Sequence, residues 1–389
     1  MWRNIASNFL TFLVLIVFLL GGVILWGQNE YAAQGPLDEA ICLQVPRGAT
    51  MRRISNRLEQ QGAVSSGMIF RLGTEYGDKT DALKAGSWLI PEGASMREVT
   101  DIVTRGGAST CGTEVVYRIG INSLTVEVRE LDPSTNRFVE RAEFNPRDSD
   151  IEVPAIFEQV RERADTRYRI AMAEGVTSWQ VVNSLRAMDV LSGDIEDVPP
   201  EGSLAPDSYE ITADDSRANL IARMRSAQDA ILAAAWEGRA DDIPLNDPYE
   251  ALILASIIEK ETGVASERGQ VASVFTNRLR RGMRLQTDPT VIYGITEGEG
   301  VLGRGIRRSE LRAATPYNTY VIDGLPPTPI ANPGRASIEA AVNPLDTDLI
   351  FFVAKSLDPG DGHLFAETLQ EHNDNVAAYR RLEAERANQ

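Results

Sequence analysis

The chain begins with a long apolar run. Residues 9–26 contain one clearly polar side chain, Thr11, and the remainder are aliphatic, aromatic or glycine. At about 1.5 Å per residue, a helix of this length crosses the hydrocarbon core of a membrane. A cleaved signal peptide is the alternative, but it has a shorter apolar core and an Ala-x-Ala site that is missing here. We therefore expect a transmembrane helix at residues 9–27, after a tail of residues 1–8.

The charges on either side of this run predict its orientation. Arg3 and the terminal amine precede it, whereas Glu30, Asp38 and Glu39 follow it. Because positive charge stays on the cytoplasmic side, the tail is expected in the cytoplasm of a cell with an inner membrane. Residues 28–41 are polar, contain a Gly-Pro pair and are predicted to be a linker. The rest of the chain is then periplasmic, where disulfides form and cell-wall polymers are at hand.

A short sequence pattern recurs three times after the linker. Residues 45–54 read Val-Pro-Arg-Gly-Ala-Thr-Met-Arg-Arg-Ile, residues 90–99 repeat that order closely, and residues 172–181 form a weaker copy. In each copy an apolar strand ends near a glycine, and a hydroxyl residue two positions later is suited to cap a helix. The predicted caps are Thr50, Ser95 and Thr177.

Residues 42–111 are predicted to form one small module. A helix within residues 64–83 and a strand at 88–90 complete an order of strand, helix, helix, strand, which resembles a LysM module. The resemblance implies glycan binding; the alternative is a spacer that orients the next domain. Cys42 and Cys111 lie at the two ends of this module, and in an oxidising compartment we expect them to pair. Two unpaired, small apolar side chains are the alternative.

Residues 112–169 differ in pattern from the module before them. Apolar and polar positions alternate in 124–131 and again in 138–144, with turn residues between the two runs, which predicts a β-hairpin. None of these residues suggests chemistry, so we interpret 112–169 as an accessory β-rich insertion. An Ala-rich helix is predicted at 222–236. Residues 170–389 then form the last domain, and the predicted fold class is α+β.

The segment at 248–262 contains the strongest candidate for chemistry. Pro248 suits the first turn of a helix and Gly263 its end. At about 100° per residue, Glu261 lies on the same face as three apolar residues, Leu254, Ile257 and Ile258. Burial there, together with the negative end of the helix, raises the pKa of a carboxyl group, as a general acid requires. Glu259 is predicted to lie on another face, beside Ala255 and Ser256, where water or a partner can reach it.

The segments that follow predict a polar, aromatic pocket. We expect a helix at 264–281 and a loop at 283–293, which contains an Asp-Pro pair. Residues 315–320 and 324–334 combine aromatic rings, amides and prolines, which suit sugar rings, although a Pro-rich surface loop is the alternative. The two histidines, His363 and His372, lack the third ligand and the usual spacing of a zinc site, so no metal is expected.

Taken in order, these motifs resemble the endolytic murein transglycosylase family, the YceG-like proteins. The resemblance is dense over residues 247–379. It rests on the segments 255–262, 284–290, 317–320, 324–327 and 330–334, and residues 204–209 resemble a segment that borders the family's active site. Glu261 takes the position of the catalytic glutamate in this family. The insertion at 112–169 is longer than the family's usual linker.

The resemblance implies a peptidoglycan lytic transglycosylase. Such an enzyme cleaves the β-1,4 bond between MurNAc and GlcNAc in nascent glycan strands, leaves 1,6-anhydro-MurNAc ends and terminates strand elongation. One glutamic acid serves as acid and then as base, so no cofactor is expected. The implied partners are glycan strands, the inner membrane and peptidoglycan synthases. The substrate-binding residues carried over from the family are Gln286, Asp288, Tyr317, Asn318 and His363.

Composition limits the remaining alternatives. The 389 residues include 39 Lys and Arg against 56 Asp and Glu, a net charge of -17, which disfavours a nucleic-acid partner. A non-catalytic, membrane-anchored glycan-binding scaffold is the main alternative, but an unused buried carboxyl group would cost free energy. A pyridoxal-phosphate lyase is a weaker one, since Lys260 is the lysine near the motif and lies off the Glu261 face.

Overall fold

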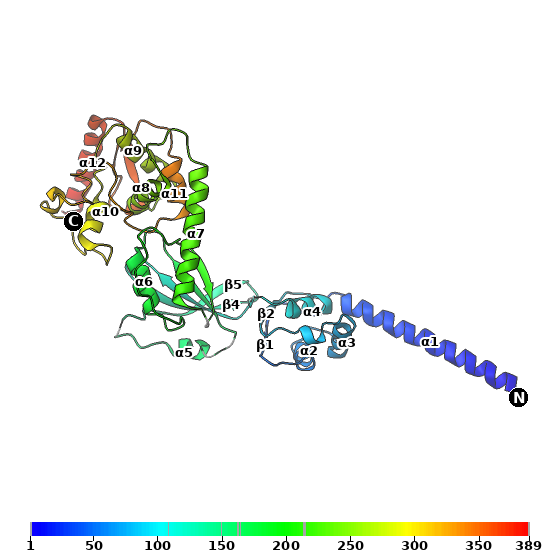
Figure 1. Cartoon of the computed structure of the whole chain (residues 1–389). Helices are drawn as coiled ribbons and strands as arrows, with labels where there is room; N and C mark the ends of the chain where they lie inside the picture. The colour runs from blue at the N-terminus through cyan, green and yellow to red at the C-terminus, as the bar shows by residue number, and fades with distance from the viewer. Residues whose placement is uncertain are drawn as a thin grey trace. The chain divides into compact units, whose positions relative to one another are not determined.

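The computed structural model describes residues 2–107, 109–148, 150–161, 163, 165–212 and 215–387, with 2–9 and 359 by their backbone alone. Its fold is mixed α+β with an N-terminal apolar helix, in agreement with the predicted class (Figure 1). The chain divides into two compact units. The first comprises Met1–Val116, Glu127–Phe144 and Glu152–Tyr168, and the second comprises Tyr117–Val126, Asn145–Ile151 and Arg169–Gln389.

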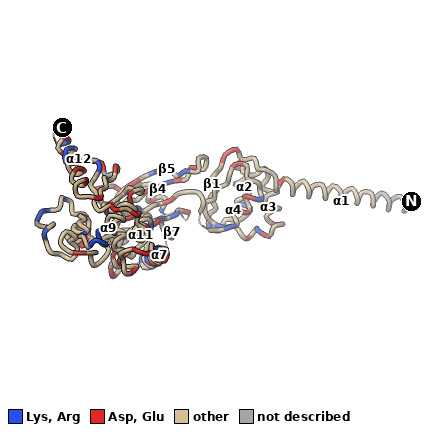
Figure 2. The backbone as a smooth tube through the Cα atoms, turned by 90° about the horizontal axis from the view of Figure 1, so that it is seen from above, with Lys and Arg blue, Asp and Glu red and all other residues tan. Residues whose placement is uncertain are grey.

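Helix α1 (Trp2–Ala32) contains the apolar run. Its segment Leu10–Ala32, of 23 residues, is long and apolar enough to cross a membrane, and none of its window is buried in the protein. Figure 2 shows that α1 carries almost no acidic or basic residues, whereas both kinds are scattered over the rest of the chain. These properties fit a single membrane span.

Residues 28–41, predicted as a linker, make fixed contacts with the module that follows. Helix α1 continues through the first of them to Ala32. Beyond it, the Gly35 N–H donates a hydrogen bond to the Gly93 carbonyl (3.0 Å), and the Gly93 N–H donates one to the Leu37 carbonyl (2.8 Å). Leu37 itself is buried. The path from α1 to the module is therefore built from packed residues.

The first unit contains the predicted order of strand, helix, helix, strand. Strand β1 (Ile41–Val45) pairs antiparallel with β2 (Gly86–Ile90), with Ile41 opposite Ile90. Between them lie α2 (Met51–Gln60), α3 (Gly67–Tyr76) and the short η1 (Thr80–Ala82), and α4 (Met96–Arg105) follows β2. Their apolar faces meet in one core that includes Leu43, Leu58, Phe70, Trp88 and Val103.

The three predicted helix caps are confirmed. The side chains of Thr50, Ser95 and Thr177 each accept a hydrogen bond from the backbone N–H three residues later. Ser95 and Thr177 form full capping boxes, which satisfy two otherwise unpaired backbone groups at each helix start. The glycine before each cap has a left-handed backbone, with φ between 65° and 76°, a conformation that favours glycine.

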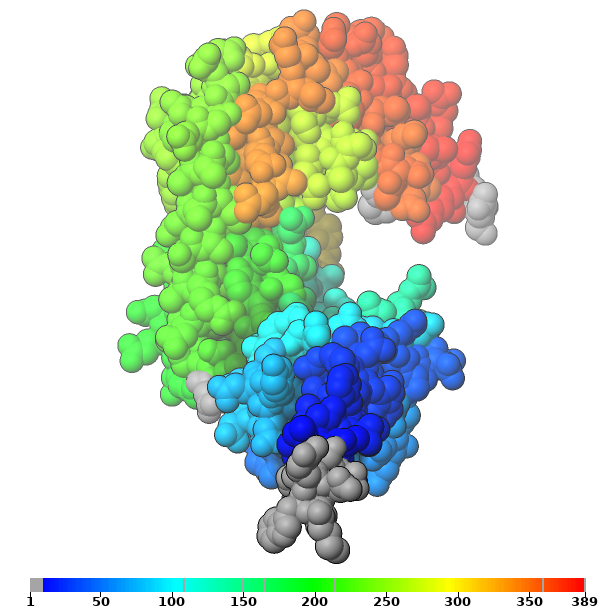
Figure 3. Space-filling view, turned by 90° about the vertical axis from the view of Figure 1, so that its right-hand side faces the viewer, coloured from blue at the N-terminus to red at the C-terminus, as the bar shows by residue number. Residues whose placement is uncertain are grey.

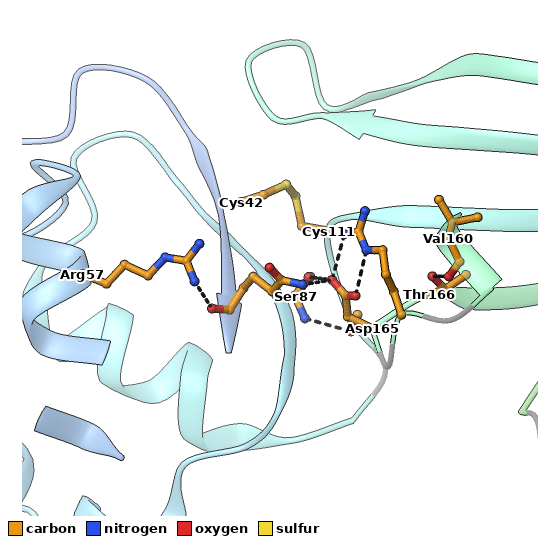
Figure 4. A network of polar contacts seen from close by, with 10 residues as sticks. Cys42, Arg57, Ser87, Cys111, Val160, Asp165 and Thr166 are labelled. Atoms are coloured by element: carbon orange, nitrogen blue, oxygen red, sulfur yellow. Dashed lines mark hydrogen bonds and ion pairs between the residues drawn. A yellow bond between two sulfur atoms is a disulfide. The ribbon is translucent and has the colours of Figure 1, made fainter. Parts of the chain in front are cut away.

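A disulfide joins Cys42, on β1, to Cys111, with the two Cα atoms 5.7 Å apart. Figure 4 shows a polar network beside it, centred on the buried carboxylate of Asp165. Asp165 accepts hydrogen bonds from the Ser87 hydroxyl (2.6 Å) and the Gln44 amide (3.0 Å), and Arg163 forms an ion pair with it. Two segments far apart in sequence are thus held to the β1–β2 pair.

The predicted hairpin is also present. It consists of β4 (Leu124–Asp132) and β5 (Arg137–Phe144), and Asp132 accepts the Ser134 N–H in the turn between them. These strands belong to a five-stranded sheet of order β5-β4-β3-β6-β7, with β3 (Thr113–Ile119), β6 (Arg167–Met172) and β7 (Ser208–Ile211). The helix α5 (Ala155–Arg161) lies between β5 and β6 in sequence. The predicted boundary at residue 170 falls within β6.

Helices dominate the second unit. They are α6 (Ser178–Arg186), α7 (Arg217–Glu237), α8 (Pro248–Glu261), α9 (Arg268–Arg280), α10 (Asp288–Thr296), α11 (Arg335–Val342) and α12 (Leu369–Ala387). Short turns η2 (Ala265–Glu267), η3 (Glu310–Arg312) and η4 (Pro359–Asp361) lie between them. Strands β8 (Phe351–Ala354) and β9 (His363–Ala366) pair antiparallel. Helix α8 contacts α7, α9, α10 and α11 (Figure 1).

Two segments of this unit differ from the sequence prediction. The helix expected at 264–281 begins as the short η2 turn, and the α-helix proper is α9. The loop expected at 283–293 ends early, because α10 begins at Asp288. The irregular pattern around Asp-Pro suggested a loop, yet the fixed φ and missing N–H of Pro289 suit the first turn of a helix.

Candidate active site

Helix α8 is the central element of the candidate site. Asp247 caps its start by accepting the Glu250 N–H (2.9 Å), and Pro248 occupies its first turn. Residues 251–258 are all buried, so the helix is apolar and enclosed on every side rather than along one stripe. A helix enclosed in this way is held in position at its far end, where Glu261 is its last residue.

Burial and one hydroxyl set the properties of the Glu261 carboxyl group. Burial raises its pKa above the ordinary value, and the nearby Asp288 carboxylate adds to the rise. A hydrogen bond from the Thr287 hydroxyl to Oε1 acts in the opposite direction, as do the nearby His363 ring and the positive charge of Arg278. The raised pKa agrees with the prediction from the helix face. A group of this kind can hold a proton that an exposed glutamate would lose.

Glu259 was predicted to be accessible to water or a partner, and this prediction was wrong. Its side chain is only 6% exposed. One carboxylate oxygen accepts the Gly334 N–H (2.9 Å), and the other lies 3.9 Å from Arg268. The helical wheel could not reveal this burial, because the loop at 330–334, which is remote in sequence, covers the Glu259 face of α8. Glu259 therefore joins that loop to the helix.

Thr287 is a site residue that the sequence analysis did not single out. Its backbone is fixed by Thr319, whose hydroxyl accepts the Thr287 N–H (3.0 Å). The Gln286 N–H also donates to the Thr319 carbonyl (3.1 Å), and Gln286 has a left-handed backbone with φ of 51°. Thr287 stands at the N-cap of α10 but makes no side-chain cap, since its hydroxyl donates to Glu261 instead. A threonine before Asp-Pro reads as an ordinary cap, which is why the sequence signal was ambiguous.

Two of the predicted substrate residues lie on either side of Thr287. Gln286 and Asp288 are both exposed, while Thr287 between them is buried. Asp288 accepts a hydrogen bond from the Tyr320 hydroxyl (2.7 Å). Burial raises the Tyr320 pKa, and the bond to Asp288 raises it further, so this hydroxyl stays protonated. Asp288 therefore lies near the Glu261 carboxyl group, and Gln286 flanks Thr287, the residue that bonds to that group.

His363 approaches the same region from β9. Its Nδ1 lies 2.9 Å from Oε2 of Glu267, and its backbone N–H donates to Oε1 of the same carboxylate (2.9 Å). A carboxylate at Nδ1 favours a proton on that nitrogen and leaves Nε2 for another partner. The His363 ring also packs edge-on against Phe352, at 5.1 Å between centroids. Both its position and its orientation are thus fixed.

Tyr317 and Asn318 are placed differently from the residues above. Asn318 is fully buried, and its amide donates to the carbonyl groups of Glu310 and Ala313 while its oxygen accepts the Tyr320 N–H. The Tyr317 hydroxyl hydrogen-bonds to Thr328 (2.8 Å). These contacts shape the loop that presents Tyr320.

A further desolvated carboxyl group, that of Glu201, was missed by the sequence analysis. It accepts the Ser178 N–H (2.8 Å) and the hydroxyl of Tyr293 (3.3 Å), and burial raises its pKa. The Asn332 amide also approaches it (3.4 Å). The available sequence signal for Glu201 was its position just before the segment at 204–209. Glu201 joins α6, α10 and the 330–334 loop.

Lys260 is the lysine next to Glu261 in the sequence. The Lys260 ammonium donates to the Gly175 carbonyl (3.3 Å), and burial lowers its pKa. Within the part of the chain that the structure describes, no group of three or more His, Cys, Asp or Glu side chains is arranged to hold a metal ion. The chemistry available here is that of a desolvated carboxyl group beside hydroxyl, imidazole and carboxylate side chains.

The YceG-like family matches residues 43–378. Because this match covers most of the chain, the chain belongs to the YceG-like family.

Relatives of the chain carry the name endolytic murein transglycosylase. The protein of that name from Bacillus subtilis (strain 168) is 26% identical over 357 residues, which are 91% of this chain and 89% of the relative. The one from Streptococcus pneumoniae serotype 2 (strain D39 / NCTC 7466) is 28% identical over 387 residues, 97% of this chain and 66% of the relative. A crystal structure of a yceG-like protein from Listeria monocytogenes is 25% identical, with a TM-score of 0.46, and the alignment covers 86% of this chain and 98% of that one.

Proposed function

We propose that this protein is a membrane-anchored, endolytic peptidoglycan lytic transglycosylase that terminates the elongation of nascent glycan strands. It cleaves the β-1,4 bond between MurNAc and GlcNAc and leaves 1,6-anhydro-MurNAc ends. The observation that carries this proposal is the Glu261 carboxyl group, which is desolvated at the end of a buried helix and bonded to Thr287. Membership of the YceG-like family and the names of the relatives support the same substrate.

In the proposed reaction, Glu261 acts first as an acid and then as a base. The protonated carboxyl group donates its proton to the glycosidic oxygen as the bond from the MurNAc C1 to that oxygen breaks. The 6-hydroxyl oxygen of the same MurNAc then bonds to C1, and its proton returns to the Glu261 carboxylate. Atoms balance without water, so the second carboxylate that a hydrolase uses to activate water is not needed. The raised pKa suits the first step, because it keeps Glu261 protonated closer to neutral pH.

The residues around Glu261 take supporting roles in this proposal. Exposed Gln286 and Asp288 are suited to hydrogen-bond sugar hydroxyls, and His363, oriented by Glu267, offers its second ring nitrogen. Tyr317 is assigned to the wall of the sugar site. Asn318 is assigned to the same region, but its buried, fully used amide favours support of the Tyr320 loop over direct contact with sugar. Separate alanine variants of Gln286 and Asp288 that bound strands as well as the parent would contradict their assignment.

We also propose a layout for the rest of the chain. Residues 1–8 are a cytoplasmic tail, 9–27 the inner-membrane helix, 28–41 the connection, 42–111 a LysM-like module, 112–169 an accessory insertion and 170–389 the periplasmic catalytic domain. The apolar helix at Leu10–Ala32 supports the anchor. Protease protection in inverted membrane vesicles, whose cytoplasmic face is outside, tests the orientation. A periplasmic catalytic domain lies inside such vesicles and is protected. Digestion of this domain in intact vesicles would contradict periplasmic placement.

The LysM-like module is assigned to glycan binding. A pocket of about 320 Å³ supports this role; Gln44, Pro46, Arg47 and Gly86 of the module line it together with Arg163 and Asp165 of the 112–169 segment. Its polar and aliphatic groups suit a sugar ring. The test compares the binding of short GlcNAc oligomers to the Glu261→Gln chain and to the same chain with Arg47→Ala added. Equal binding would show that the pocket is not the binding site and would favour a spacer role. The Cys42–Cys111 disulfide is proposed to close this module in the periplasm, and free thiols in non-reducing peptide maps would contradict it.

One digestion tests the proposed activity against the alternative of a non-catalytic scaffold. Purified, uncrosslinked glycan strands are incubated with the full chain in detergent, and the products are separated and weighed by mass spectrometry. The proposal predicts internal cleavage to shorter strands with anhydro ends. Strands that stay at full length while still binding the protein would support the scaffold and contradict the enzyme.

A further inference from the structure

Helix α3, in the first unit, exposes an apolar row. Met68, Leu72 and Tyr76 lie four residues apart and are 63%, 55% and 87% exposed. Among the described residues 33–107, these three are the exposed large apolar side chains, and all of them lie on this one helix. Apolar side chains gathered in this way mark a surface that contacts something else.

The neighbouring row of α3 packs against the end of α1. A Cβ atom on Gly73 would overlap the Tyr31 ring, so the glycine permits this close approach. The Tyr31 hydroxyl donates to Thr100 (2.8 Å), and the Ser65 hydroxyl, just before α3, donates to Glu30 (2.5 Å). Residues three and four apart on a helix share a face, so the row of Leu72 and Tyr76 is adjacent to the row that contains Gly73. The exposed row therefore lies beside the last turn of α1.

The length of α1 sets the depth of this contact in a membrane. Residues 9–27 rise about 29 Å as a helix, which matches a hydrocarbon core of roughly 30 Å. Tyr31 lies four residues further, about 6 Å beyond the hydrocarbon, where the polar headgroup layer extends for roughly 5–8 Å. Because α3 packs on Tyr31, its exposed row is held at the level of that layer. Figure 3 shows the surface of the module around the base of α1, seen from the side toward which α1 projects.

We propose that the apolar row Met68, Leu72 and Tyr76 rests in the headgroup layer of the membrane that α1 crosses. Exposed aromatic and aliphatic side chains at this depth bury their apolar surface while the tyrosine hydroxyl stays hydrated. The connection at 33–41 is packed on the module, so α1 and the row act as two contacts on one body. They hold the residues 42–111 against the bilayer in one orientation. This inference rests on the anchoring role of α1 in the proposed function.

Fluorescence quenching in lipid nanodiscs tests the inference with the full chain. An environment-sensitive fluorophore is attached to a single introduced cysteine, Leu72→Cys, since the two native cysteines are paired. The nanodiscs contain phospholipid with a spin label near the headgroup. Arg47→Cys is the matched control. Arg47 is exposed and lies just beyond Val45, at the end of β1 that is farther from Ile41 and from the connection to α1. Val23→Cys reports insertion of α1 itself.

The expected result is strong quenching at Val23, a roughly twofold or larger loss of emission at Leu72 and little change at Arg47, since only the first two sites lie within the bilayer or its headgroup layer. Quenching at Val23 without quenching at Leu72 would overturn the inference and leave the anchor intact; the row would then be open to a protein partner. No quenching at Val23 would contradict the anchor and the inference together. Quenching at Leu72 that persisted unchanged with Met68→Ser and Tyr76→Ser would show that the row does not hold the contact.

Discussion

Two faces at the end of α8 each contain a buried carboxyl group, but their surroundings differ. On one face Glu259 accepts a backbone N–H from Gly334 and lies beside the guanidinium of Arg268. On the other face Glu261 has one hydroxyl partner, Thr287, and a desolvated carboxyl group with a raised pKa. Burial raises the pKa of the Glu261 carboxyl group, whereas a backbone N–H and a nearby guanidinium hold the Glu259 carboxylate in a structural contact. Burial alone thus does not identify a catalytic acid; the partners of the buried group do.

The largest expected effect comes from replacing the acid at Glu261. Glu261→Gln keeps the shape of the side chain but cannot donate an acidic proton, so the rate of strand cleavage should fall by about 10²–10⁴-fold. Glu259→Gln is the matched control and should retain most of the activity. Initial rates on purified strands measure both. Equal rates for the two variants would show that Glu261 and Glu259 do not differ in their catalytic roles.

The same two substitutions should affect the free energy of unfolding in the opposite order, and by a smaller amount. Glu259→Gln replaces charge-assisted contacts to Gly334 and Arg268 with neutral ones, which should lower the free energy of unfolding by about 1–2 kcal/mol. Glu261→Gln removes a desolvated acid and should cost nothing. Urea denaturation of both full-length variants in detergent, followed by circular dichroism, provides the comparison. A larger loss for Glu261→Gln than for Glu259→Gln would mean that Glu261 is the structural residue.

The pH dependence of stability sharpens the comparison further. Because the folded-state pKa of Glu261 is raised, the unfolded chain ionises first as pH rises, and folding loses stability between the unfolded and the folded pKa. Each unit of rise corresponds to about 1.4 kcal/mol. The stability advantage of Glu261→Gln over the parent should therefore be absent below about pH 4 and grow towards neutral pH. An advantage that stayed constant from pH 4 to pH 8 would contradict a raised pKa.

The smallest predicted effect concerns Thr287. Its hydrogen bond lowers the Glu261 pKa, so Thr287→Val should raise that pKa and move the alkaline fall of kcat/KM to higher pH. The rate at the optimum should change by less than about tenfold, because the acid itself remains. Thr287→Ser keeps the hydroxyl and is the control. A pH profile that is identical for Thr287→Val and the parent would show that this hydroxyl does not act on Glu261 in the working enzyme.

The fold was predictable from sequence where local rules decide it. The three caps at Thr50, Ser95 and Thr177, the hairpin at 124–144 and the apolar helix α1 all follow from short-range patterns. The start of α10 was missed because Asp-Pro is found both in turns and in first helical turns. The packing of residues 33–41 on the module was also missed, since it depends on the partner Gly93, which is distant in sequence.

The candidate site was predictable only in part for the same reason. The helix face of Glu261 indicated a desolvated acid, because three apolar residues of α8 itself share that face. Glu259 and Thr287 could not be placed, because their surroundings come from the 330–334 loop and from Thr319. Contacts between remote segments decide which buried polar group is structural and which is available for chemistry.

The central claim is that a single glutamic acid cleaves the strand without water, and one digestion tests it directly. Purified strands are cut by the full chain in water enriched in ¹⁸O, and the new ends are weighed by mass spectrometry. We expect 1,6-anhydro ends that contain no ¹⁸O, because the sugar's own 6-hydroxyl completes the reaction. Reducing ends that carry ¹⁸O would show hydrolysis, which requires a water-activating carboxylate and would contradict the account.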